Sequence, residues 1–108
     1  LKLTANLRVV PEERIEQARL QMQLKRAQDN VRKRPNAEQL LQLLQHEYEL
    51  LLARMQDYYS IKKQLLLQRK DKLVAQYQAV DFKNKYNEFK QHLQQQQQHW
   101  QRLVDAFA

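Results

Sequence analysis

Few side chains in this sequence have the types and spacing that catalysis requires. The single serine, Ser60, has Lys62 and Lys63 close by but no histidine at helical spacing. A serine nucleophile needs an oriented base and a site for an oxyanion. Glycine and cysteine are both absent, which excludes Gly-rich phosphate loops, thiol nucleophiles and thiolate zinc sites. The sequence therefore predicts a protein that is not an enzyme.

The histidines and carboxylates also lack the spacing of a metal or acid–base site. His92 and His99 are seven residues apart, whereas two metal-binding histidines on one helix are usually four apart. Glu47 and Glu49 flank Tyr48 on different helix faces and do not converge as an acid–base pair would. We therefore expect neither a metal nor a cofactor.

Basic residues outnumber acidic ones, with 19 Lys and Arg against 12 Asp and Glu, so the formal net charge is +7. Tyrosines are interleaved with them in the second half of the chain, a pattern that can bind single-stranded nucleic acid. The tyrosines also fit the hydrophobic seams described below, which favours a structural role for them. Nucleic acid or an anionic lipid surface is therefore a secondary partner class. The candidate anion-binding residues are Lys62, Lys63, Arg69, Lys70 and Lys72.

The composition predicts an all-α fold. The chain is rich in Leu, Gln, Lys, Arg, Glu and Ala, which are good helix formers, and it has two prolines and no glycine. Glycine supplies the left-handed conformations of many tight turns, so strand-rich and loop-rich folds are disfavoured. The expected architecture is an elongated antiparallel helical hairpin or coiled coil, with a three-helix bundle as the variant.

The segment VRKRPNAEQL, residues 31–40, carries consecutive stop and start signals for helices. Cations suit the negative end of a preceding helix, and Pro35 disfavours α conformation at Arg34. Asn36 is a good N-cap, and Gln39 completes a capping box. We predict a first helix over 11–34, a turn at 35–36 and a second helix from Ala37, with a kinked rod as the alternative because no glycine closes the turn.

The first and second helices carry complementary apolar stripes. On the first helix, Leu20, Leu24, Ala27 and Val31 form one apolar stripe, and Ile15, Ala18 and Met22 form a second, shorter one. We therefore expect this helix to touch more than one other helix. Leu40, Leu43, Leu50 and Leu52 widen the stripe of the second helix. The predicted intramolecular seam packs the two stripes together and consists of Leu20, Leu24, Ala27, Val31, Leu41, Leu44, Tyr48, Leu51, Met55 and Tyr58.

A third apolar stripe, rich in aromatic residues, lies near the end of the chain, and we call it the aromatic seam. It is connected to the stripe of the second helix only through polar or small residues at 68, 72, 75 and 79. No proline or glycine forces a break, so one helix over 37–108 is preferred to a break near 80–81. That helix would leave the aromatic seam without an intramolecular partner, and exposed apolar seams mark interaction sites. The predicted protein interface is Phe82, Tyr86, Phe89, Leu93, Trp100, Leu103 and Phe107.

Residues 1–10 alternate apolar and polar side chains, as a half-buried strand does. No second strand pattern follows, so we expect an extended or disordered arm. The longest apolar runs are three residues and no signal peptide pattern opens the chain, which favours an intracellular location, cytoplasmic or nuclear.

One short stretch, QHEYELLLARM at residues 45–55, resembles the His/Gln–acidic–aromatic–Glu stretch of the primosomal replication restart protein family of small helical, DNA-associated proteins. The likeness covers about a tenth of the chain, and the region before residue 40 does not continue it, so no residue roles are carried over. The residues themselves favour a non-catalytic structural or adaptor module that pairs with another protein or with its own copies through helical seams. A basic module for nucleic acid or anionic membrane is the alternative.

Overall fold

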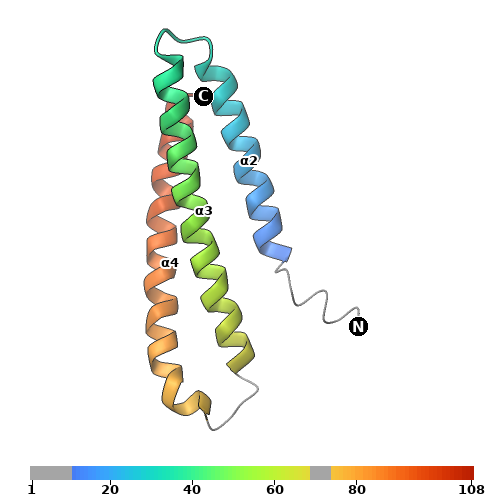
Figure 1. Cartoon of the computed structure of the whole chain (residues 1–108), viewed down its shortest axis with the longest axis vertical. Helices are drawn as coiled ribbons and strands as arrows, with labels where there is room; N and C mark the ends of the chain where they lie inside the picture. Colours follow the sequence, from blue (N-terminus) through green and yellow to red (C-terminus); the bar gives the residue numbers. More distant parts are fainter. Residues whose placement is uncertain (1–10, 69–73) are drawn as a thin grey trace.

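Three long helices make up the part of the chain that the structure, a computed structural model, describes. It describes the backbone of residues 11–68 and 74–108 and the side chains of residues 12–66 and 83–108. The helices are α2 (Pro11–Val31), α3 (Ala37–Gln68) and α4 (Val74–Ala106). They run antiparallel to their neighbours in the sequence (Figure 1). The predicted all-α class is therefore confirmed, in its three-helix form. The strand-like arm expected at residues 1–10 lies outside the described residues.

The first turn occurs close to the predicted place. Helix α2 ends at Val31, three residues earlier than predicted, and the turn spans residues 32–36. The Arg34 amide donates to the Val31 carbonyl at 2.9 Å, and the Asn36 carbonyl accepts the first bond of α3 from the Leu40 amide at 3.1 Å. None of the described residues has a positive φ. The chain thus reverses here without the left-handed residue that glycine would supply.

The single helix preferred over residues 37–108 is wrong. Helix α3 ends at Gln68 and α4 begins at Val74, so Asp81 lies inside α4 and the predicted alternative break near 80–81 is misplaced as well. The interruption falls within the stretch of polar and small residues that weakly joined the two seams. The longest extent of the molecule is 60 Å, compared with about 105 Å for a continuous helix. Folding back is favoured because it buries the apolar seam of α4 against α3.

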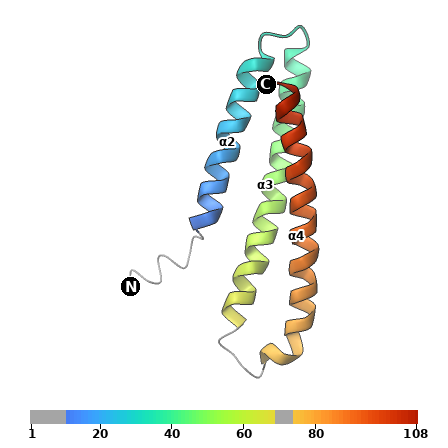
Figure 2. The ribbon, with the colours of Figure 1, turned by 180° about the vertical axis from the view of Figure 1, so that it is seen from behind.

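Helix α3 is the central element and carries most of the packing. It packs extensively against α4 and less against α2, whereas α2 and α4 touch only sparsely. Figure 2 shows α2 and α4 on either side of α3, seen from behind. The core is one cluster of twelve buried apolar residues drawn from all three helices: Leu20, Leu24, Ala27, Val31, Leu44, Tyr48, Leu51, Met55, Tyr59, Leu93, Trp100 and Phe107.

The end of α4 is tied to the first turn. The Arg34 guanidinium lies over the ring of Phe107, 5.1 Å from its centroid. Phe107 is buried, and the C-terminus lies beside the turn that joins α2 and α3 (Figure 1). This cation–π contact therefore links the turn to the last residues of the chain. No helix in the described ranges has the length and apolar content needed to cross a membrane.

Candidate protein-interaction surfaces

The structure places the whole predicted intramolecular seam inside the bundle. Eight of its ten residues belong to the buried core, and Leu41 and Tyr58 are partly buried and pack against it. Leu44, Leu51 and Met55 are fully buried. The seam therefore holds α2 on α3, and it is not a surface for a partner.

The aromatic seam assigned to a partner protein also lies inside the bundle. Leu93, Trp100 and Phe107 are buried core residues, and Leu103 packs against them. Tyr86 contacts Tyr58 of α3, Phe89 is half-buried, and the side chain of Phe82 lies outside the described residues. The assignment of this seam to a partner is therefore corrected. It rested on a continuous helix, whereas the reversal between Gln68 and Val74 gives the seam α3 as an intramolecular partner.

Trp100 on α4 contacts both of the other helices. Its ring lies 5.9 Å from the ring of Tyr48 on α3 in a tilted arrangement. Its indole nitrogen donates a 2.8 Å hydrogen bond to Gln23 on α2. A buried tryptophan usually satisfies its N–H in this way while its rings supply apolar contact. Trp100 therefore contributes both to the apolar core and to the polar contact between α2 and α4.

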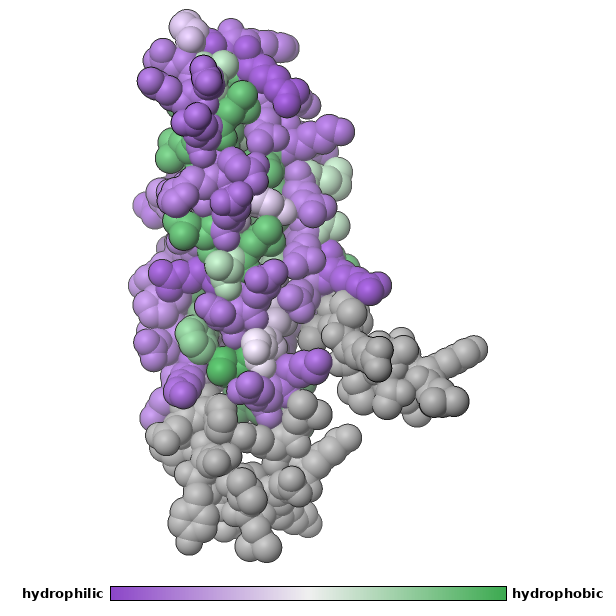
Figure 3. All heavy atoms as spheres, in the orientation of Figure 1, coloured by the Kyte–Doolittle hydropathy of each residue, from purple (hydrophilic) through white to green (hydrophobic). Residues whose placement is uncertain are grey.

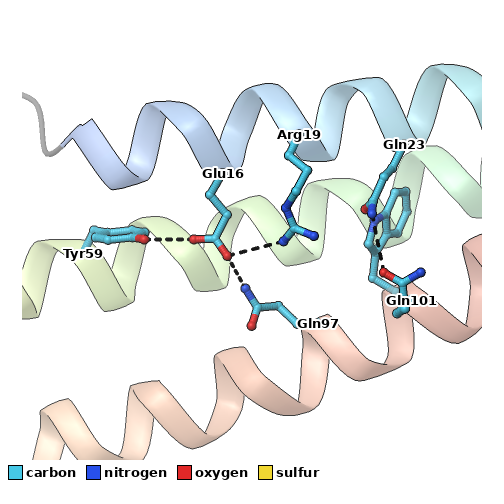
Figure 4. A network of polar contacts seen from close by, with 7 residues as sticks. Glu16, Arg19, Gln23, Tyr59, Gln97 and Gln101 are labelled. Atoms are coloured by element: carbon cyan, nitrogen blue, oxygen red, sulfur yellow. Dashed lines mark hydrogen bonds and ion pairs between the residues drawn. The ribbon is translucent and has the colours of Figure 1, made fainter.

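A polar network fills the space between α2 and α4 (Figure 4). Glu16 is its centre, with a side chain only 19% exposed. Its carboxylate accepts a 2.8 Å hydrogen bond from the Tyr59 hydroxyl and a further bond from the Gln97 amide, and Arg19 lies 3.8 Å away. Gln23 also donates to Gln101 at 3.4 Å. The α2–α4 contact is therefore mainly polar, which explains why α2 relies on α3 for its apolar packing.

Tyr59 belongs to this network, and Tyr58 lies next to it with its ring 5.1 Å from that of Tyr59. Burial raises the pKa of both phenols above the ordinary 10.0, and hydrogen bonds with Tyr86 and Glu16 respectively raise it further. The Tyr58 and Tyr86 hydroxyl oxygens are 3.0 Å apart. The folded state therefore strongly favours the neutral phenols.

We expect the fold to lose stability in alkali through these two tyrosines. The folded chain holds their protons to a higher pH than the unfolded chain does. Their stabilising contribution is therefore fully present below about pH 10 and is lost as the pH rises above that value. Urea unfolding followed by circular dichroism across this range should show a steeper decline for the parent than for Tyr58→Phe/Tyr59→Phe. Equal slopes would contradict the prediction.

Two of the three histidines, His92 and His99, each pair with a single carboxylate. His99 Nε2 lies 3.1 Å from Glu47, which also accepts a 3.2 Å hydrogen bond from Gln96. His92 lies 3.7 Å from Glu88 on its own helix. Among the side chains of residues 12–66 and 83–108, no group of three or more His, Asp or Glu could hold a metal ion. These histidines therefore serve helix contacts in the described fold.

The structure describes only two of the five candidate anion-binding residues, Lys62 and Lys63. Lys62 forms a 3.1 Å ion pair with Glu12 and lies near the rings of Tyr58 and Tyr59. Lys63 is exposed. Arg69, Lys70 and Lys72 lie outside the described residues. The Tyr58–Tyr86 contact fixes the register of α3 and α4, so Lys62 and Lys63 lie at about the level of Lys83. The spacing of the basic residues in the sequence did not reveal that Lys83 lies near the level of Lys62 and Lys63.

Large apolar side chains remain exposed on two helices. Ile15 and Met22 of α2 are 70% and 57% exposed, and Leu43 and Leu50 of α3 are each 41% exposed. Leu66 is exposed as well. Figure 3 shows hydrophobic residues on one face as separate patches among hydrophilic ones. Leu43 and Leu50 were expected to widen the intramolecular seam, but they lie one residue before the buried positions Leu44 and Leu51, and this offset turns them outward.

The comparisons with known proteins add no family to this description. The described geometry leaves two exposed apolar rows, Ile15 with Met22 and Leu43 with Leu50, and places Lys62 and Lys63 at about the level of Lys83. Neither row coincides with a seam predicted to bind a partner. Searches against protein-family models, curated proteins and solved structures found no match for the chain.

Proposed function

We propose that this chain is a non-catalytic helical module that joins proteins through apolar rows on the outside of its bundle. The observation that carries the proposal is the exposure of two pairs of large apolar side chains, Ile15 with Met22 and Leu43 with Leu50. Each pair is separated by seven residues, or two helical turns, so its members lie on one face of a helix. Partner helices recognise rows with this spacing.

The chemistry of the remaining surface supports a non-catalytic role. Ser60 is exposed on α3, and the nearby Lys62 is engaged by Glu12. The carboxylate of Glu47, the least exposed of the acids paired with a histidine, is occupied by His99 and Gln96. Lys62 and Glu47 already serve contacts between helices, whereas the exposed apolar side chains of the two rows are not among the residues that form the core.

Site-specific photo-crosslinking in cells tests the proposal. A photoreactive amino acid is introduced into the full chain at Met22 or Leu50, and at the exposed polar positions Gln42 and Gln56 as controls. We expect discrete protein adducts from the row positions, which a second substitution in the same row (Ile15→Gln or Leu43→Gln) reduces. Adducts that form equally from the control positions, or that nuclease treatment removes, would contradict a protein-assembly role.

The arrangement of the basic end favours one second function, the binding of nucleic acid or an anionic membrane. Between residues 62 and 85 the sequence has seven Lys and Arg against two Asp, and the hairpin brings the described Lys62 and Lys63 to the level of Lys83. Binding through phosphates weakens steeply with salt. Charge reversal at Lys62, Lys63 and Lys83 should remove salt-sensitive DNA or vesicle binding and leave crosslinks from Met22 unchanged.

A further inference from the structure

We infer that the outward face of α2 binds an acidic amphipathic helix of a partner protein. This inference rests on the proposed assembly function and specifies both the surface and the chemistry of the partner. The face consists of an apolar stripe, Ile15, Ala18 and Met22, with cationic side chains on both sides. We call it the α2 outer face.

The stripe lies directly opposite the buried side of α2. Met22 is two residues from both Leu20 and Leu24 in the sequence, and two residues correspond to about 200° around a helix. Leu20 and Leu24 are buried, whereas Ile15, Ala18 and Met22 are exposed. The stripe therefore contributes nothing to the core that holds α2 on α3.

The spacing and sizes of the stripe suit a partner helix. Ile15, Ala18 and Met22 occupy positions i, i+3 and i+7, the spacing by which one helix anchors another. Ala18 lies between two larger side chains, and a small residue there allows the partner's side chain to approach the backbone of α2 closely. Met22 is unbranched and adapts to the shape of an apolar contact.

The charges beside the stripe specify an acidic partner. At about 100° per residue, Arg14 and Lys25 lie on one side of the stripe, and Arg19 and Arg26 lie on the other. All four are exposed. Arg19 has only a 3.8 Å contact with Glu16, and within the described part of the chain the other three have no acidic partner.

Of the four described carboxylates of α2 (Glu12, Glu13, Glu16 and Asp29), only Glu16 forms an ion pair with one of these cations, through its contact with Arg19. Glu12 pairs with Lys62, and Asp29 pairs with Arg32 of the turn. Glu16 turns inward to Tyr59 and Gln97. The α2 outer face therefore presents an apolar centre between positive margins, the complement of a helix with an apolar stripe and acidic margins.

Other occupants fit this face less well. A second copy would bring its own Arg14, Arg19, Lys25 and Arg26 against the same cations, and like charges across an interface are unfavourable. Nucleic acid would use the cations and leave the apolar centre without a contact. An anionic membrane could use both, but membrane-binding helices bury a larger apolar face rich in Leu, Phe and Trp.

The test uses the full chain and two fluorescent helical peptides with the same leucine stripe. One carries Glu at the positions beside the stripe and the other carries Lys at the same positions. Fluorescence anisotropy should show that the Glu peptide binds at least about tenfold more tightly than the Lys peptide. Ile15→Gln/Met22→Gln should weaken the Glu peptide by about tenfold or more, and moderate salt should weaken it in part.

The matched control is Gln42→Ala/Gln56→Ala, which changes two exposed polar positions of α3 outside both apolar rows and should leave peptide binding unchanged. Both double variants change exposed residues, and circular dichroism checks that their helix content is retained. Equal binding of the two peptides, insensitivity to the α2 substitutions, or capture of phosphatidylserine vesicles or duplex DNA through Ile15 and Met22 would overturn the inference. If the Glu peptide fails while Met22 still crosslinks to protein, the inference fails and the proposed assembly function stands.

Discussion

Replacing Trp100 with alanine should destabilise the fold by about 3–5 kcal/mol, the range for removing a large aromatic side chain from a core. Trp100 is 1% exposed, contacts the ring of Tyr48 and donates to Gln23. The substitution would therefore remove apolar contact with α3 and a hydrogen bond to α2 together. Urea unfolding monitored by far-ultraviolet circular dichroism, which reports helix content, measures this change in the free energy of unfolding.

A matched variant keeps this prediction informative even if Trp100→Ala does not fold. Trp100→Phe keeps the ring contact and loses the hydrogen bond, so it should cost clearly less than the alanine change. Gln98→Ala, at an exposed position of the same helix, should change stability by no more than about 0.5 kcal/mol. A Trp100→Ala variant as stable as Gln98→Ala would show that the aromatic seam is not part of the intramolecular core.

The second large effect distinguishes two adjacent leucines. Leu51 is completely buried and Leu50 is 41% exposed. Leu51→Ala should therefore cost about 2–5 kcal/mol through lost apolar contact and an unfilled cavity. Leu50→Ala should cost less than about 1 kcal/mol, because its side chain already lies partly in water. Both residues lie within α3, so helix propensity is the same in the two changes and packing alone separates them.

Leu44 and Leu43 repeat the comparison two turns earlier. Leu44 is completely buried, while Leu43 is 41% exposed. The ratio of the two costs in each pair reports which face of α3 points inward. If Leu50 or Leu43 proved to be the costly member, α3 would be rotated relative to the described packing. The proposed protein-binding row on that helix would then be wrong as well.

The two stability results also separate fold from function. Substitutions at Leu50 and Leu43 are expected to leave the bundle intact and to reduce protein crosslinks from α3. Substitutions at Leu51 and Trp100 should reduce both, because they loosen the bundle itself. A functional assay on core variants alone would not distinguish these causes.

The local sequence was sufficient to predict α2, the first turn and the start of α3. Pro11 starts α2, the Pro35–Asn36 pair precedes α3, and the 3,4 spacing from Leu41 to Tyr58 predicts the face that is buried. These signals are local because backbone caps, proline geometry and helical periodicity act over a few residues. The packing of Leu20, Leu24, Ala27 and Val31 on that face followed from the short turn, which brings consecutive helices side by side.

What the aromatic seam packs against depended on the tertiary structure. Trp100 and Phe107 have the pattern of an apolar helix face, and that pattern is the same whether the face covers another protein or the same chain. No proline or glycine marks the reversal between Gln68 and Val74, so the sequence held no strong local signal for it. The burial of the seam against α3 makes the reversal favourable, and burial is a property of the folded chain.

The sequence by itself thus determined the class of the fold, the first hairpin and the presence of three apolar seams. Only the tertiary structure decided that the aromatic seam is used internally, and that Ile15, Met22, Leu43 and Leu50 remain exposed. It also decided that Glu16 would meet Tyr59 and Gln97, residues 43 and 81 positions away. The physical reason is that periodicity fixes which side chains share a helix face, whereas only the packing of one helix on another fixes what that face contacts.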